Sequence, residues 1–131
     1  MAVELQYLAW SVVLGLALLL WAAALVTRQR GVAWNAGNRE EPLAPPAGMA
    51  GRADRAFRNF LETFPLLAAA AVAVVVAGRT GEGTALGMQL YFWGRVAHAG
   101  FYVAGIRYLR SLAWVVSMAG LLLVLWPLLA G

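Results

Sequence analysis

Charged and amide side chains recur at helical spacing in the second apolar part of the chain, and these residues could do chemistry. Arg55, Arg58, Asn59 and Glu62 are spaced i, i+3, i+4 and i+7, which places them within about 100° of one helix face. Glu62 falls inside an apolar run, where an unpaired charge is costly, so it needs a partner or a water-filled cavity. Arg58 is the nearest candidate partner. The stripe is either a ligand site or an interhelical ion-pair cluster that holds a helix bundle together.

A second polar stripe follows about thirty residues later. Tyr91, Arg95, His98 and Tyr102 are spaced i, i+4, i+7 and i+11, again on one helix face. The chain has one histidine and no cysteine, so we predict no metal site. Arg95 and His98 belong either to a ligand site or to a pair of groups that neutralises Glu62 across the bundle.

Positive charge returns just beyond the second stripe, at Arg107 and Arg110, with Ser111 beside them. These arginines also have a simpler explanation as charges that orient the protein in a membrane. Together the polar residues predict a basic pocket with one carboxylate at a membrane edge. Such a pocket suits a small zwitterionic molecule whose carboxylates meet arginine forks, and the apolar surfaces beside it suit a lipophilic reactant.

The elements that position these residues are transmembrane helices. Of 131 residues, 63% are hydrophobic and 12% are charged, a composition that suits a bilayer rather than water. The first apolar run, from Leu5 to Val26, is long enough to cross about 30 Å of hydrocarbon. We predict an all-α membrane protein with a single domain, residues 1–131, and a bundle of four transmembrane helices at about 5–26, 53–77, 86–106 and 112–129.

The arginines predict the orientation of the bundle, because short loops rich in arginine stay in the cytoplasm. We therefore expect a cytoplasmic loop at about 27–52, a second cytoplasmic turn at 107–111, and both termini outside the cytoplasm. Basic residues that flank helices suit an anionic membrane surface, so we expect no nucleic-acid partner. The expected cytoplasmic side carries Arg28, Arg30, Arg39, Arg52, Arg55, Arg58, Arg107 and Arg110. The opposite side carries Arg79 alone.

Three segments of the chain resemble one known family. They are the stretch Arg55-Ala-Phe-Arg58-Asn59-Phe-Leu-Glu62-Thr-Phe-Pro65, the stretch Arg95-Val-Ala-His98-Ala-Gly-Phe-Tyr102, and the stretch Leu109-Arg110-Ser111-Leu-Ala-Trp114. The first is similar to the helix-two signature of the MAPEG family, the membrane-associated proteins in eicosanoid and glutathione metabolism. With the length and the helix count, the resemblance covers most of the chain.

The resemblance implies a homotrimer that holds glutathione, as cosubstrate, between neighbouring subunits. It places Arg55, Asn59 and Glu62 in the glutathione site, with Arg58 and Tyr102 beside them. Arg110, helped by Ser111, would stabilise the glutathione thiolate, and Arg28 or Arg30 would supply a further arginine. We assign Arg95 and His98 to the same site. The residues named in this paragraph are the complete candidate site, and no metal belongs to it.

The resemblance leads to two functional hypotheses. The first is a glutathione-dependent membrane transferase or peroxidase that acts on a lipophilic electrophile or a lipid hydroperoxide, in a bacterial inner membrane. The second is a non-catalytic protein of the same fold that binds lipid or serves as a scaffold. A small multidrug transporter is a weaker alternative, because that class needs a carboxylate midway along its first helix, and Glu4 lies at the start of the first helix here.

Overall fold

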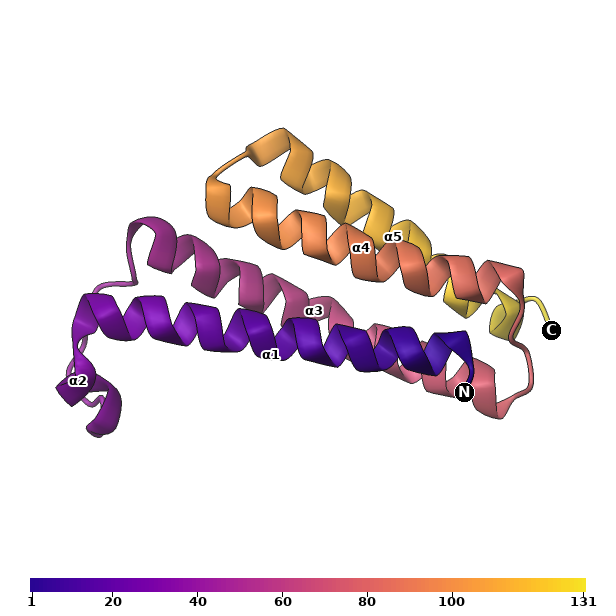
Figure 1. Ribbon diagram of the computed structural model, residues 1–131, viewed down its shortest axis with the longest axis horizontal. Coiled ribbons are helices and arrows are strands. Elements are labelled where there is room, and N and C mark those ends of the chain that lie inside the picture. The colour runs from indigo at the N-terminus through magenta and orange to yellow at the C-terminus, as the bar shows by residue number, and fades with distance from the viewer.

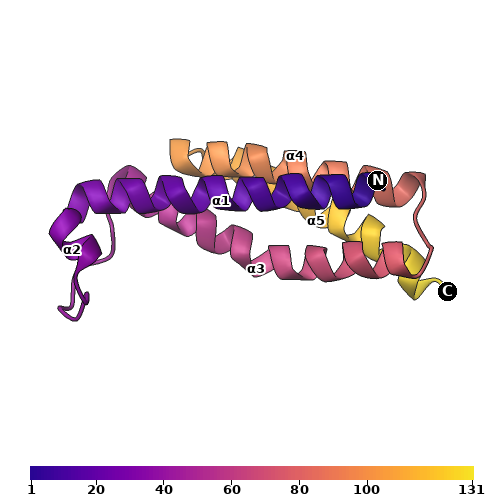
Figure 2. The ribbon, with the colours of Figure 1, turned by 60° about the horizontal axis from the view of Figure 1, so that its bottom comes forward.

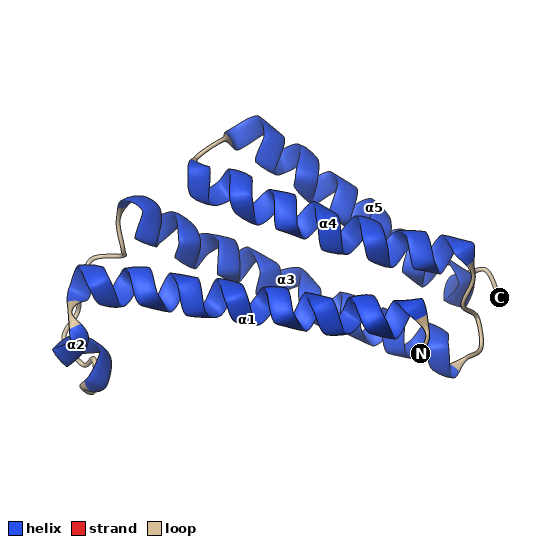
Figure 3. Cartoon of the chain, in the orientation of Figure 1, coloured by secondary structure: helices blue, strands red, loops and turns tan.

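The computed structural model describes all residues from Met1 to Gly131, and every regular element in it is a helix (Figure 1, Figure 3). Four helices are long and one is short. In chain order they are α1 (Val3–Arg30), α2 (Val32–Ala36), α3 (Gly48–Val76), α4 (Glu82–Ala104) and α5 (Arg107–Leu129).

Three of the long helices, α1, α3 and α5, are long and apolar enough to cross a membrane. Helix α4, which carries the buried Arg95 and His98, is not among them. The prediction of an all-helical integral membrane protein is confirmed by these spans and by the absence of any strand.

The long helices form two antiparallel pairs (Figure 1, Figure 2). Helix α1 lies beside α3, and α4 lies beside α5. Both chain termini lie at one end of the bundle, whereas α2 and the α4–α5 turn lie at the other end (Figure 1). The arginine-rich segments of the chain therefore gather at a single end, which we call the arginine end.

Glycines let α4 and α5 approach each other closely. A Cβ atom added at Gly87 would lie 2.5 Å from the carbonyl oxygen of Gly120, and one added at Gly94 would lie 3.1 Å from that of Ala113. Inside a bilayer the hydrophobic effect does not drive helices together, because lipid tails are as apolar as the side chains. Close approach of the two backbones instead allows favourable van der Waals packing.

The core lies between the two pairs, where α3 contacts α4 and α5. Two side-chain hydrogen bonds cross it, because polar groups in an apolar interior must find partners there. The hydroxyls of Thr63 and Tyr91 lie 3.0 Å apart, and the Thr84 hydroxyl lies 3.0 Å from a carboxylate oxygen of Glu4. The second contact joins the start of α1 to the start of α4. The apolar core residues include Leu18, Phe60, Leu67, Ala71, Val74, Met88, Tyr91 and Val124.

The helices extend beyond the apolar runs from which they were predicted. Helix α1 continues to Arg30 and α3 begins at Gly48, so the predicted loop at 27–52 shrinks to residues 31–47 and contains α2. Apolarity reports only the part of a helix that lies in hydrocarbon, whereas backbone hydrogen bonds continue through polar residues that reach water.

The predicted turn at 107–111 is instead the first turn of α5. The chain reverses at Gly105 and Ile106. Gly105 has a positive φ of 82°, and the Ile106 N–H donates a 2.9 Å hydrogen bond to the Phe101 carbonyl. This glycine-based helix end needs only two residues, so Arg107 and Arg110 are helical.

Candidate functional site

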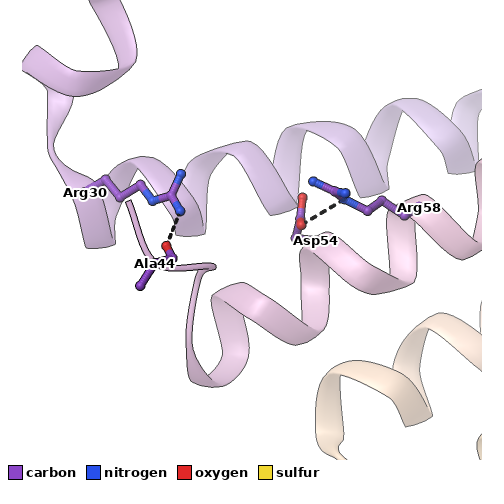
Figure 4. Close-up of polar contacts among 4 residues, drawn as sticks. All are labelled: Arg30, Ala44, Asp54 and Arg58. Atoms are coloured by element: carbon purple, nitrogen blue, oxygen red, sulfur yellow. Dashed lines mark hydrogen bonds and ion pairs between the residues drawn. The ribbon is translucent and has the colours of Figure 1, made fainter. Parts of the chain in front are cut away.

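The segment 31–47, which we call the loop cap, is held against the ends of α1 and α3. The Gln29 side-chain amide donates to the Ala47 carbonyl at 3.2 Å and accepts from the Ala47 N–H at 3.1 Å. Arg30 Nη2 donates to the Ala44 carbonyl at 2.6 Å (Figure 4). At Gly51, the carbonyl of Pro46 occupies the space that a Cβ would need. Side-chain hydrogen bonds and a close backbone contact therefore join the loop cap to the ends of α1 and α3.

A pocket of about 620 Å³ lies between the loop cap, α1 and the first turns of α3; we call it the cap pocket. Arg58 Nε lies 3.1 Å from Asp54 Oδ2 on its wall (Figure 4), and this is the only ion pair in the structure. Its polar lining residues are Thr27, Arg30, Asn35, Arg39, Asp54, Arg55 and Arg58.

A second pocket, of about 290 Å³, lies at the same end of the bundle, against the other side of α3; we call it the helix-end pocket. The Arg110 guanidinium carbon lies 4.5 Å from the centroid of the Tyr102 ring. The Tyr102 and His98 rings meet edge to face at 5.4 Å. Thus α4 and α5, joined by the short Gly105 turn, present an aromatic wall and a guanidinium to one cavity. Its lining residues are Asn59, His98, Tyr102, Arg110, Ser111, Trp114 and Val115.

Arg52 holds the wall of the helix-end pocket in place, a role beyond the orienting charge that its position in the sequence predicted. Its Nε donates a 2.8 Å hydrogen bond to the carbonyl of Val103, in the last turn of α4. A cation at a helix C-terminus satisfies a free carbonyl and meets the negative end of the helix dipole. The signal was present in the sequence, because Arg52 precedes Arg55 by three residues and continues the same stripe by one turn.

Two of the predicted site residues have buried side-chain atoms with unmet hydrogen-bonding capacity. Arg95 is 1% exposed, and its Nε and Nη1 have no hydrogen-bond partner within the chain. Its guanidinium carbon lies 5.8 Å from the ring centroid of Phe60. The side-chain oxygen of Asn59 also lacks a partner. Buried polar groups are normally satisfied, so these atoms are exceptions within the chain.

The predicted single stripe on α3 is divided by the structure. Arg55 and Arg58 line the cap pocket, Asn59 lines the helix-end pocket, and Glu62 lines neither and is exposed. The four side chains span about 100° around the helix axis, so they lie on both sides of the surface by which α3 packs on its neighbours.

None of the candidate partners of Glu62 forms an ion pair with it in the single chain. Arg58 pairs with Asp54, and neither Arg95 nor His98 lies within ion-pair distance of Glu62. An acid four residues before a base is the favoured orientation on a helix, which the pair of Asp54 and Arg58 satisfies and the reverse pair would not.

The remaining candidates lie at the arginine end. Arg28 is exposed and makes no side-chain hydrogen bond, whereas Arg30 is half-buried and bonded to the loop cap. Ser111 is exposed, and its hydroxyl donates to the Arg107 carbonyl at 3.2 Å. No group of three or more histidine, cysteine, aspartate or glutamate side chains could hold a metal ion.

The fold and the site together define a helical integral membrane protein with an arginine-lined polar site at one end of its bundle. The model of the MAPEG family matches residues 7–130. The chain therefore belongs to the MAPEG family, as its resemblance predicted. A search of curated proteins finds no match to this chain.

Proposed function

We propose that this protein is a glutathione-dependent membrane transferase or peroxidase that acts on a lipophilic electrophile or a lipid hydroperoxide. Its family includes glutathione-dependent enzymes of these kinds, as well as non-catalytic members. The observation that carries the proposal is the helix-end pocket, where Arg110 and Ser111 border a cavity open to a small ligand.

The chemistry proposed for Arg110 is activation of the glutathione thiol. A thiol with a pKa near 8.5 is mostly protonated at neutral pH, and a nearby guanidinium favours the thiolate. In transfer, the thiolate sulfur bonds to an electrophilic carbon, and the group that leaves that carbon takes up a proton. In peroxide reduction, two glutathione molecules are oxidised to the disulfide while the O–O bond is cleaved to an alcohol and water.

The binding half of the proposal rests on side chains that have no partner in the chain. Arg55 and Glu62 are exposed on α3 and make no ion pair, and Asn59 and Arg95 have free hydrogen-bonding atoms. Glutathione offers two carboxylates to arginines and one ammonium group to Glu62. Groups without a partner in the chain suit a ligand held between copies of the chain.

The proposed assembly is therefore a homotrimer, in which a helix-one arginine of a neighbouring copy completes the site. Of the two candidates, Arg28 is free, whereas Arg30 already binds the loop cap. We assign the role to Arg28. The Arg28→Ala variant should then weaken glutathione binding more than Arg30→Ala does, and the reverse order would transfer the role to Arg30.

The proposed orientation places the arginine end in the cytoplasm and both termini outside it, with α4 as the fourth span, in a bacterial inner membrane. Two features support it: the arginine bias of the sequence, and the position of both termini at the opposite end of the bundle (Figure 1). A C-terminal green fluorescent fusion should stay dark in cells, and bright fluorescence would overturn the orientation.

The function is tested by the ultraviolet difference spectrum of the detergent-purified protein during titration with glutathione at neutral pH. We expect saturable thiolate absorbance that Arg110→Ala abolishes. The matched control is Arg107→Ala, one turn earlier in α5 and exposed, which should retain the signal. If the signal is absent, or if it survives Arg110→Ala, the proposed mechanism is wrong.

One observation favours the second function, a non-catalytic lipid-binding protein. An almost wholly apolar hollow of about 310 Å³ lies on α4 and α5, bordered by Trp93, Phe101, Leu109 and Leu112. If the titration gives no thiolate signal but the protein binds a fluorescent fatty acid saturably, the non-catalytic function replaces the first.

A further inference from the structure

The cap pocket has a positively charged end built around one indole ring. The guanidinium carbon of Arg30 lies 4.7 Å from the centroid of the Trp34 ring, and that of Arg39 lies 4.6 Å from it. Arg39 also bonds to Asn35, and Arg30 bonds to the Ala44 carbonyl. Two like charges are thus held close together by one aromatic ring and by backbone oxygens, without a carboxylate bonded to either of them.

The whole pocket has an excess of positive charge. Four arginines and one carboxylate, Asp54, line it, and Asp54 is already paired with Arg58. Arg55 makes no ion pair. Its guanidinium lies next to Gly51, because Nη1 would be 3.1 Å from a Cβ atom added at that glycine. The arrangement leaves the charges of Arg30, Arg39 and Arg55 without a counter-ion, so the pocket favours an anion that can accept several hydrogen bonds.

The opposite end of the cap pocket is apolar. Leu19, Ala22, Ala23 and Val26 of α1 line it together with Phe57 of α3. Leu19 and Arg30 are eleven residues apart on one helix, a rise of about 16 Å. Since α1 is one of the membrane-spanning candidates and Arg30 lies in its last turn, the charged end of the pocket is at headgroup depth and the apolar end is in hydrocarbon.

We propose that the cap pocket binds one anionic phospholipid, with its phosphate between Arg30 and Arg39 and one acyl chain along α1 from Val26 to Leu19. A soluble anion would use only the charged end, whereas a lipid uses the whole length of the pocket. A zwitterionic phospholipid would bring its ammonium group into a site that already has excess positive charge. The lipid site is separate from the helix-end pocket, although Arg55 and Arg58 of its wall and Arg30 are also candidates for the glutathione site. Arg39 belongs to the cap pocket alone.

Native mass spectrometry of the delipidated protein in detergent tests the proposal, with phosphatidylglycerol and phosphatidylcholine as probes. We expect phosphatidylglycerol to be retained, and retained at least about tenfold more strongly than phosphatidylcholine, as charge-assisted hydrogen bonds allow. Arg39→Gln should weaken phosphatidylglycerol binding by about tenfold. The matched control is Arg79→Gln, which removes an exposed arginine in the turn between α3 and α4 and should change nothing.

A second variant tests the acyl-chain part of the site without altering any charge. Ala23 is exposed and lines the apolar end, so Ala23→Phe should fill the channel and weaken phosphatidylglycerol binding while the fold is retained. Circular dichroism would verify that each variant is folded. Glycerol phosphate alone, the headgroup without chains, should bind far more weakly than the lipid.

Three results would overturn the proposal. They are equal retention of the two phospholipids, unchanged phosphatidylglycerol binding in folded Arg39→Gln and Ala23→Phe, and glycerol phosphate binding as strong as lipid binding. The last would identify a soluble-anion site instead. Because Arg39 lies outside the proposed glutathione site, Arg39→Gln should keep the thiolate absorbance, so failure of this proposal and failure of the proposed function are distinguishable.

Discussion

Arg52 Nε donates a hydrogen bond of 2.8 Å to the carbonyl oxygen of Val103, which lies 51 residues later in the chain. The bond joins the beginning of α3 to the last turn of α4, at the end of the bundle where both pockets lie. Tyr102 is the preceding residue, so this bond fixes the backbone that carries the aromatic wall of the helix-end pocket.

Removal of this bond should loosen the bundle at that end. We expect Arg52→Ala to lower the free energy of unfolding by about 1.5 kcal/mol, the size of a hydrogen bond from a charged donor. Thermal denaturation in detergent, followed by circular dichroism, measures the loss. The control is Arg107→Ala, an exposed arginine just past the same turn, and an equal loss in both variants would contradict a specific role for Arg52.

Glu4 and Glu62 should respond to the same substitution in opposite ways. Glu4 is 4% exposed and bonded to Thr84, so we expect Glu4→Ala to destabilise the fold by about 1–2 kcal/mol. Glu62 is exposed and unpaired, so Glu62→Ala should change stability by less than about 0.5 kcal/mol. If the Glu62 carboxylate receives the ammonium group of glutathione, Glu62→Ala should nevertheless weaken glutathione binding by about tenfold or more.

Denaturation midpoints and glutathione titrations of the two variants separate structural from ligand-binding carboxylates. A stable Glu62→Ala protein with unchanged glutathione affinity would remove Glu62 from the site. A Glu4→Ala protein as stable as the native protein would show that the hydrogen bond to Thr84 contributes little.

The close packing of α4 on α5 gives a third prediction. Gly87→Ala would place a methyl group 2.5 Å from a backbone oxygen that cannot move aside, and we expect a loss of about 1–3 kcal/mol. Gly100, on the same helix, has open space around it, so Gly100→Ala should be neutral or stabilising by up to about 1 kcal/mol. Denaturation curves should show a loss of stability for Gly87→Ala and none for Gly100→Ala. A similar loss of stability in both variants would indicate a general effect of substitutions in α4 rather than packing on α5.

Much of this fold could be predicted from the sequence, because membrane spans leave a strong apolar signal. The helices around Leu14, Ala70 and Leu122 follow from it directly. Helix ends could not be predicted in the same way. Arg30 and Arg107 are helical although they lie outside the apolar runs, because a helix needs only its backbone bonds to continue into water.

The candidate site was only partly predictable for a related reason. Periodicity finds which residues share a helix face, but it does not say which neighbour covers that face. Arg58 and Asn59 are adjacent in sequence and on one predicted face, yet they border different pockets on two sides of α3. The role of Trp34 could not be predicted from the sequence, because its contacts with Arg30 and Arg39 depend on how the loop cap folds.

The last prediction concerns how Tyr102 assists Arg110. The ring lies under the guanidinium at 4.5 Å, and a cation–π contact of this kind is worth about 0.5–1 kcal/mol at a partly exposed site. Tyr102→Leu should therefore reduce the affinity for the glutathione thiolate by about two- to fivefold, whereas Tyr102→Phe keeps the ring and should stay close to the native protein. Thiolate absorbance across a glutathione titration measures both variants. Equal losses in the two would assign the effect to the phenol hydroxyl instead of the ring, because the hydroxyl is the group that both variants lack.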